Sequence, residues 1–154
     1  MSKIEAFLTA EEEQEIIDAI RIAEKNTSGE IRIHLERTSK IDVFDRAKEV
    51  FHMLKMDNTK QQNGVLIYVA VEDKTFVIYG DEGINKVVEN DFWDKTRDVI
   101  LAQFKNGQFK QGLIDGVLRA GKELETFFPW HHGDTNELPN TISKGWKKFL
   151  KYYS

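Results

Sequence analysis

The sequence contains no cysteine and only two prolines among its 154 residues. The absence of cysteine excludes disulfide bonds, thiolate metal sites and cysteine nucleophiles, and it leaves the redox compartment undetermined. The sequence also has no apolar run of membrane-spanning length, and its first residues, Met1 to Glu5, form no apolar signal core. We therefore expect a cytoplasmic protein.

The chain also lacks an excess of positive charge. It carries 22 lysines and arginines against 26 acidic residues, a net charge of −4. Binding to nucleic acid through the phosphate backbone needs a basic face, so we expect no nucleic-acid partner. The length is typical of a single domain, and a hydrophobic content of 40% is enough to form a core.

The hydrophobic periodicity predicts alternating helices and strands. Thr9 and Glu12 have the spacing of a capping box, Asp42 can cap a second helix, and Asp91 can cap a third. The helices are predicted at about 10–25, 42–55, 91–105 and 108–127, with a short turn of helix at 84–88. The strands are predicted at 31–35, 65–70 and 75–79. Polar Arg32 and His34 alternate with apolar neighbours, which predicts a less buried face on the first strand.

The connections between the strands predict a mixed sheet. Only residues 71–74 join the second and third strands, a hairpin-length link that makes them antiparallel. A helical segment separates the first and second strands, which favours a parallel right-handed crossover. Three polar motifs then meet at one sheet edge: Thr27-Ser28-Gly29-Glu30, Gln61-Gln62-Asn63-Gly64 and Gly80-Asp81-Glu82-Gly83.

A change in composition divides the chain after Pro129. We expect residues 1–130 to form the α/β domain and residues 131–154 to form a linker followed by a tail. The linker, 131–143, is polar and contains His131-His132-Gly133-Asp134, a poor preorganised site for a transition metal. The tail, 144–154, is basic and aromatic, which suits peripheral contact with an anionic membrane surface or docking to a protein partner. The alternative is that the tail folds back onto the acidic body.

The motifs together resemble the TPM domain family, which includes plant thylakoid-lumen acid phosphatase-like proteins and bacterial members. The resemblance rests on Thr27-Ser28-Gly29-Glu30-Ile31-Arg32, Asn63-Gly64-Val65-Leu66-Ile67 and Gly80-Asp81-Glu82-Gly83-Ile84, and it covers about 9–129. Phe92-Trp93 and the turn at 104–107 continue it. It implies an α/β fold with a small mixed β-sheet sandwiched between α-helices, and a divalent-cation site, usually for calcium. It also implies a protein partner of the membrane-associated LemA type, and a phosphatase activity attributed to some members.

The oxygen-bearing side chains at the predicted corner suit calcium or magnesium, which prefer hard oxygen ligands. The candidate metal ligands are Asp81, Glu82, Asp91, Asp94, Glu30 and Asn63. A site assembled from separated segments would be weak, with a Kd on the order of 10⁻⁵–10⁻³ M. Simpler roles are open for several of them: Asp91 is explained as a helix cap, Asp94 by the helix dipole, and Glu30 as a solvated residue at a strand start.

Two other functions remain open from the sequence. A metal-assisted phosphatase would need an activated water or a nucleophile with a base, and the sequence has no P-loop and no aspartyl-phosphate signature. Thr27 and Ser28 supply hydroxyls near the corner, without an obvious histidine base, and Arg32 and Lys60 supply positive charge. The other alternative is a metal-independent scaffold that binds a membrane surface or a protein through its tail.

Overall fold

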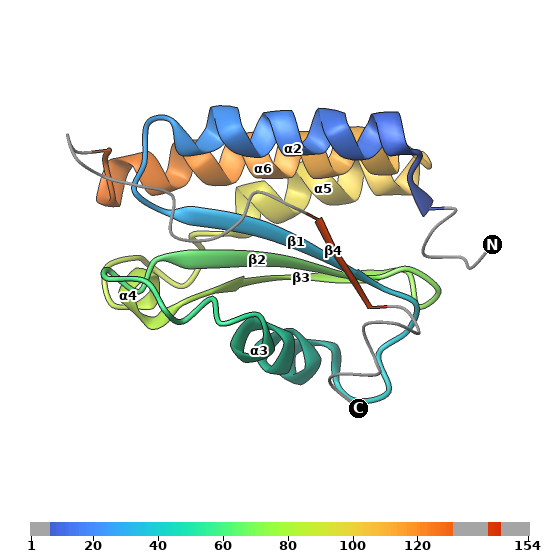
Figure 1. Ribbon diagram of the computed structural model, residues 1–154, viewed down its shortest axis with the longest axis horizontal. Coiled ribbons are helices and arrows are strands. Elements are labelled where there is room, and N and C mark those ends of the chain that lie inside the picture. Colours follow the sequence, from blue (N-terminus) through green and yellow to red (C-terminus); the bar gives the residue numbers. More distant parts are fainter. Residues whose placement is uncertain (1–6, 131–141, 146–154) are drawn as a thin grey trace.

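The computed structural model describes residues 7–130 and 142–145 as a sheet between two helical layers (Figure 1). The four-stranded sheet has the order β3-β2-β1-β4. Helices α2, α5 and α6 cover one face, and α3 covers the other. The helices are α2 (Ala10–Glu24), α3 (Val43–Met53), α4 (Glu82–Asn85), α5 (Asp94–Lys105) and α6 (Phe109–Phe127). The strands are β1 (Glu30–Glu36), β2 (Gly64–Ala70), β3 (Thr75–Gly80) and β4 (Ile142–Gly145).

Two of the predicted helix caps are confirmed. Thr9 and Glu12 form the complete capping box at the start of α2. Asp42 caps α3 by accepting hydrogen bonds from the backbone N–H groups of Phe44 and Asp45. Both helices therefore begin where a side-chain oxygen satisfies N–H groups that have no partner within the helix.

The boundaries around α4 and α5 differ from the prediction. Helix α5 begins at Asp94, its N-cap is Trp93, and no side chain caps it, so the prediction that Asp91 caps this helix is wrong. Residues 91–93 form a turn instead, in which the Phe92 ring packs against Trp93 at 4.6 Å between ring centroids. The short helix starts earlier than predicted because Asp81 acts as the N-cap of α4.

The predicted strand directions are confirmed. β1 and β2 pair in parallel with Glu30 opposite Gly64, and β2 and β3 pair antiparallel with Val65 opposite Gly80. The starts of β1 and β2 and the end of β3 therefore lie at one edge of the sheet, as the topology argument requires.

A fourth strand appears where the sequence patterns predicted none. Ile142–Gly145 pairs in parallel with β1, with Ile33 opposite Ile142 and Glu36 opposite Gly145. Four residues with one apolar side chain are too few for the alternation that predicts a strand. The rest of the predicted linker and tail, including His131 and His132, lies outside the described residues.

Two hydrophobic clusters fill the space on either side of the sheet. The larger lies between the sheet and α2, α5 and α6, and it contains Ile31, Ile33, Val65 and Ile67. The smaller lies under α3 and contains Leu66, Tyr68 and Phe51. The predicted less buried face of β1 is wrong, because His34 is fully buried and Arg32 partly so. In the part of the chain that the structure describes, no helix is long and apolar enough to cross a membrane.

Candidate functional site

The polar corner forms at the sheet edge where β1 and β2 begin. The backbone N–H of Asp81 donates to the Gly64 carbonyl oxygen at 3.0 Å, which places the end of β3 beside the start of β2. The Asn63 side-chain amide donates to the Ser28 hydroxyl at 3.2 Å. The backbone N–H of Glu30 faces the Asn63 carbonyl oxygen at 3.4 Å. All three motifs are therefore in contact, as predicted.

Gly83 allows α4 to approach the loop before β2 very closely. A Cβ atom at this position would lie 2.1 Å from the Gln61 carbonyl oxygen and 2.5 Å from that of Gln62. Gln62 itself has a φ of 51°, a left-handed conformation that non-glycine residues seldom adopt. This packing brings the Gln61 and Gln62 carbonyl oxygens against the first turn of α4, the helix that Asp81 caps, and only a glycine at position 83 permits it.

Among the carboxylates of the three motifs, Asp81 is the second most buried, after Glu30. Only 8% of its surface is exposed. Its Oδ1 accepts a hydrogen bond from the Glu82 backbone N–H at 2.7 Å, whereas its Oδ2 is buried and has no hydrogen-bond partner. Burial is the main cause that raises the pKa of Asp81, and the negative charges of Asp57 and Glu82 raise it further. The hydrogen bond from the Glu82 backbone and the nearby His52 lower this pKa, but they do not cancel the rise. Asp81 therefore carries a charge that its surroundings do not compensate.

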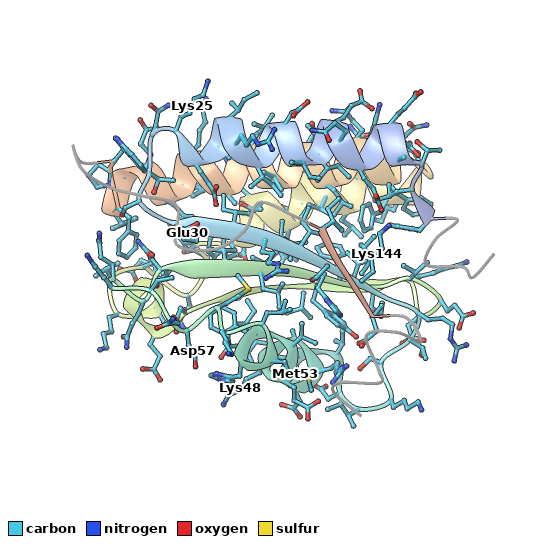
Figure 2. The ribbon with its side chains drawn as sticks, viewed as in Figure 1. Lys25, Glu30, Lys48, Met53, Asp57 and Lys144 are labelled. Atoms are coloured by element: carbon cyan, nitrogen blue, oxygen red, sulfur yellow. The ribbon has the colours of Figure 1, made fainter. Side chains whose placement is uncertain are left out.

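Asp57 is a corner residue that the sequence analysis missed. It follows α3 in the loop before β2, and Figure 2 shows it at the same end of the sheet as Glu30. It is exposed, and its carboxylate pairs with His52 at 2.9 Å. Its only sequence signal is its place in the polar segment 56–62, which is equally typical of an ordinary turn.

Glu30 lies beside a second buried carboxyl group. Glu24, at the end of α2, accepts a hydrogen bond from the Ile31 backbone N–H at 2.8 Å, and both glutamates are more than nine-tenths buried. Burial is the main cause that raises the pKa of Glu24, and the charge of Glu30 adds to it, bringing that pKa to about 8. This pair therefore holds a proton at neutral pH. Glu24 also borders a cavity of about 340 Å³ with Arg21, Lys25 and Trp130.

The remaining predicted ligands do not join a preformed cluster. Asp94 pairs with Arg97 at 3.3 Å, Asp91 is exposed in the turn before α5, and the Glu82 side chain is exposed. Within residues 7–130 and 142–145, no three acidic or histidine side chains stand close enough together to hold a metal ion. The corner therefore offers the buried carboxyl groups of Asp81 and Glu30, amide and hydroxyl oxygens, and further acids near the surface.

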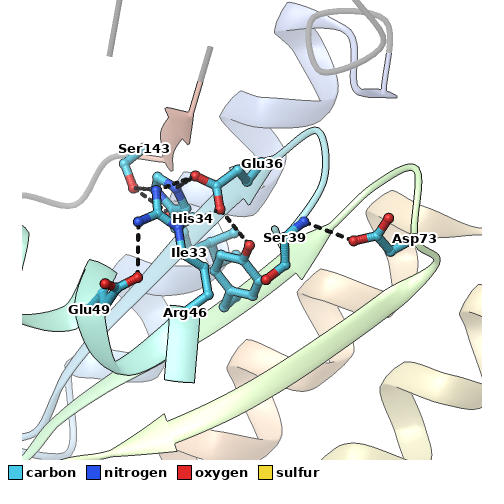
Figure 3. A network of polar contacts seen from close by, with 9 residues as sticks. Ile33, His34, Glu36, Ser39, Arg46, Glu49, Asp73 and Ser143 are labelled. Atoms are coloured by element: carbon cyan, nitrogen blue, oxygen red, sulfur yellow. Dashed lines mark hydrogen bonds and ion pairs between the residues drawn. The ribbon is translucent and has the colours of Figure 1, made fainter. Parts of the chain in front are cut away.

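A second polar network lies between the sheet and α3 (Figure 3). Arg46 donates to both oxygens of Glu36, at 2.9 and 2.6 Å, and the Tyr68 hydroxyl donates to Glu36 at 2.5 Å. Burial would raise the pKa of Glu36, but the hydrogen bonds from Arg46 and Tyr68 outweigh it and lower that pKa to about 2. Glu36 is therefore ionised and fully compensated.

The same network joins β4 to β1 through His34 and Ser143. The Ser143 hydroxyl donates to the Ile33 carbonyl oxygen at 3.2 Å, so it accepts the hydrogen bond from His34 Nδ1 at 2.8 Å. Burial lowers the pKa of His34 and keeps its ring neutral. Serine, histidine and Glu36 have the composition of a catalytic triad, but all three side chains are buried, and the Ser143 hydroxyl is shared with the Ile33 carbonyl oxygen. The network is structural.

The hydroxyl groups near the corner are also engaged. Thr27 donates to the Phe128 carbonyl oxygen, and its oxygen accepts from the Gly29 backbone N–H. The Ser28 hydroxyl accepts from the Asn63 amide. Neither hydroxyl has a hydrogen bond to a histidine among the described residues, so the observed geometry provides no activated nucleophile at this corner.

The fold and the corner define a mixed α/β domain whose sheet edge gathers carboxylate, amide and backbone oxygens. The sequence pattern of the TPM domain matches residues 2–123, and the chain belongs to this family. The solution structure of BA42 from the psychrophilic bacterium Bizionia argentinensis is 74% identical, covers 94% of this chain and all of its own, and superposes with a TM-score of 0.88.

Two more distant solved structures share the fold. The N-terminal domain of a P. gingivalis protein is 18% identical with a TM-score of 0.66, and the match covers 82% of this chain and 83% of that one. The N-terminal domain of cg2496 from Corynebacterium glutamicum is 11% identical with a TM-score of 0.55, covering 76% and 74%. No curated protein matched the chain.

Proposed function

We propose that this TPM domain binds calcium or magnesium at the corner around Asp81, and that the bound ion adjusts the surface offered to a protein partner. The observation that carries the proposal is the buried Asp81 carboxylate, whose Oδ2 has no hydrogen-bond partner. Asp57 and Glu82 repel its charge. A divalent cation would reverse that repulsion and supply the missing partner for the oxygen.

The geometry favours a weak, loop-ordering site. Asp81 and the Asn63 and Ser28 oxygens lie on segments already in contact, while Asp57 and Glu82 are exposed and would have to turn inward. Moving them reduces the net binding free energy, so we retain a Kd on the order of 10⁻⁵–10⁻³ M. The ion would order the segment before β2 against the start of α4. Of the other candidate ligands, Glu30 shares a proton-holding pair with Glu24, and Asp94 would have to leave Arg97.

The test is a calcium titration, then a magnesium titration, followed by backbone amide NMR shifts. We expect saturable shifts at 28–30, 57–64 and 80–84. At 10 mM calcium and a Kd of about 1 mM, the free energy of unfolding should rise by about 1.4 kcal/mol. Binding should tighten as the pH rises through the elevated pKa of Asp81, because the ion displaces a proton.

Asp81→Asn is the decisive variant, because asparagine keeps the oxygen that accepts the Glu82 N–H but removes the charge. We expect it to fold and to lose the calcium-dependent shifts. The matched control is Asp18→Asn, at an exposed aspartate on α2 that is paired with Arg21. Flat spectra into the millimolar range, or unchanged binding by Asp81→Asn, would contradict the proposal.

The partner in this proposal is a protein, for which a membrane-associated protein of the LemA type is the candidate, acting from the cytoplasm. The tail is a second element of contact, and Lys144 bears on how to test it. Lys144 lies on β4 and forms an ion pair with Glu13 of α2, so it belongs to the folded body. A deletion should therefore begin after Gly145. If removing 146–154 leaves sedimentation with anionic vesicles unchanged, the tail is not a membrane contact.

A further inference from the structure

A cavity of about 510 Å³ lies at the opposite end of the sheet from the polar corner. Its walls come from the turn between β2 and β3, the end of α5 and the start of α6. This volume is in the range of small-molecule sites in proteins. The cavity shares no lining residue with the three motifs of the corner, so it is independent of the proposed cation site.

The lining is mainly apolar, and four phenylalanines form its largest side chains. Four phenylalanines follow one another ring to ring: Phe7 to Phe109 at 4.6 Å, Phe109 to Phe104 at 5.4 Å, and Phe104 to Phe76 at 5.4 Å between centroids. Leu101 and Phe109 are 38% and 37% exposed, so the apolar wall reaches the surface. An apolar wall that is open to solvent indicates a place for an apolar ligand.

The mouth of the cavity is positively charged. Lys74, in the turn between β2 and β3, and Lys105, at the end of α5, both line it, and in the described part of the chain neither forms an ion pair. The two acids of the same turn are engaged elsewhere: Asp73 accepts from Thr38 and Ser39, and Glu72 pairs with Arg37. The lysine charges at the mouth are therefore not compensated from the turn.

From this combination we infer that the cavity binds a medium-chain fatty carboxylate, its acyl chain against the phenylalanines and its carboxylate between Lys74 and Lys105. The chemistry of such a ligand matches both parts of the cavity. A neutral apolar molecule would make no use of the lysines, and a small hydrophilic anion would make no use of the aromatic wall.

The test is a titration of the full chain with decanoate below its micelle concentration, followed by amide NMR shifts. We expect saturable shifts at 69–76 and 101–109, and none at the corner. Octanoate, two methylene groups shorter, should bind about fifteenfold more weakly if the whole chain is buried. Lys74→Gln/Lys105→Gln should weaken octanoate about threefold to tenfold and leave octan-1-ol unchanged. Lys48→Gln/Lys86→Gln, at exposed positions outside the cavity, is the matched control.

A second pair of variants tests the wall. Leu101→Trp should fill the cavity and abolish decanoate binding, whereas Leu118→Trp, at a leucine that is 37% exposed outside the cavity, should leave it unchanged. Thermal unfolding checks that both variants fold, and the lysine pair tests the proposal even if Leu101→Trp does not. The absence of saturable shifts, or equal weakening of octanoate and octan-1-ol, would overturn the proposal. Two further results would overturn the proposal. If decanoate binds only after residues 2–6 are deleted, the occupant of the cavity is the chain itself. If decanoate only dissociates a dimer, the occupant is a second copy of the chain.

Discussion

The two buried polar regions of this domain differ in how their carboxylates are compensated. Glu36, under α3, receives two hydrogen bonds from Arg46 and one from Tyr68, and its pKa falls to about 2. Glu24 and Asp81, at the ends of α2 and β3, receive one backbone hydrogen bond each, and burial raises the pKa of both.

This difference separates a structural role from an available site. A buried carboxylate with its own arginine is already bound to a cation, so an added ion gains nothing there. A buried carboxylate that lacks one carries an unfavourable charge, which a proton or a metal ion can relieve. The polar corner is of the second kind, and this is why the proposed function rests on it.

The largest expected effect comes from removing the compensation at Glu36. Arg46→Met should lower the free energy of unfolding by about 3–5 kcal/mol at pH 7, because it leaves a buried charge without a partner. Urea denaturation of the variant and the parent protein measures this loss of stability. Arg21→Met, at an exposed ion pair, should cost less than about 0.5 kcal/mol. Adding Glu36→Gln to Arg46→Met should restore part of the loss, and a purely additive double variant would contradict the pairing.

The free energy of unfolding should depend on pH through the buried pair Glu24 and Glu30 at the corner. The pKa of Glu24 rises from 4.5 to about 8 on folding, so the folded state holds the proton between these values. The stabilisation is complete below pH 4.5 and is lost as the pH rises toward 8. We therefore expect Glu24→Gln to gain stability relative to the parent protein by on the order of 1–3 kcal/mol between pH 5.5 and 8. A difference that stays constant with pH would show that Glu24 does not titrate in this range.

The close approach at Gly83 provides a way to alter the corner alone. Gly83→Ala should cost about 1–3 kcal/mol, because the new methyl group meets the Gln61 carbonyl oxygen. It should also remove the calcium-dependent shifts, while the amide shifts of His34 and Glu36 stay unchanged. Lys86→Ala, at an exposed residue beside α4, is the control. Calcium binding that survives Gly83→Ala would show that the approach of α4 is not needed for the site.

The smallest expected effect concerns the attachment of β4. Ser143→Ala removes the hydroxyl that accepts from His34 and should cost about 1 kcal/mol. Hydrogen exchange of the amides at 142–145 should become faster, while the central strands β1 and β2 keep their protection. Ser39→Ala, at a less buried hydroxyl that donates to Ile41, should leave the exchange of β4 unchanged.

Much of the architecture follows from local sequence signals. The strands alternate or run continuously apolar, Thr9 with Glu12 and Asp42 mark helix starts, and the short turn at 71–74 requires an antiparallel pair. These features depend on residues close together in the chain, and the meeting of the three polar motifs follows from strand direction. The predicted start of α5 at Asp91 was wrong, because the packing of Phe92 against Trp93 takes the place of a side-chain cap.

Only the tertiary structure determines which buried polar side chains have a partner that compensates their charge or completes their hydrogen bonds. The alternation of Arg32 and His34 with apolar residues predicted a less buried face of β1, but α3 covers that face. His34 is also hydrogen-bonded to Ser143, which lies 109 residues further along the chain. Glu36 and Arg46 are ten residues apart and meet because α3 folds back across the sheet. Charge compensation depends on distance in space and on burial, and sequence separation specifies neither. The sequence by itself therefore determined where the candidate site lies, and the fold determined that its buried Asp81 oxygen has no hydrogen-bond partner.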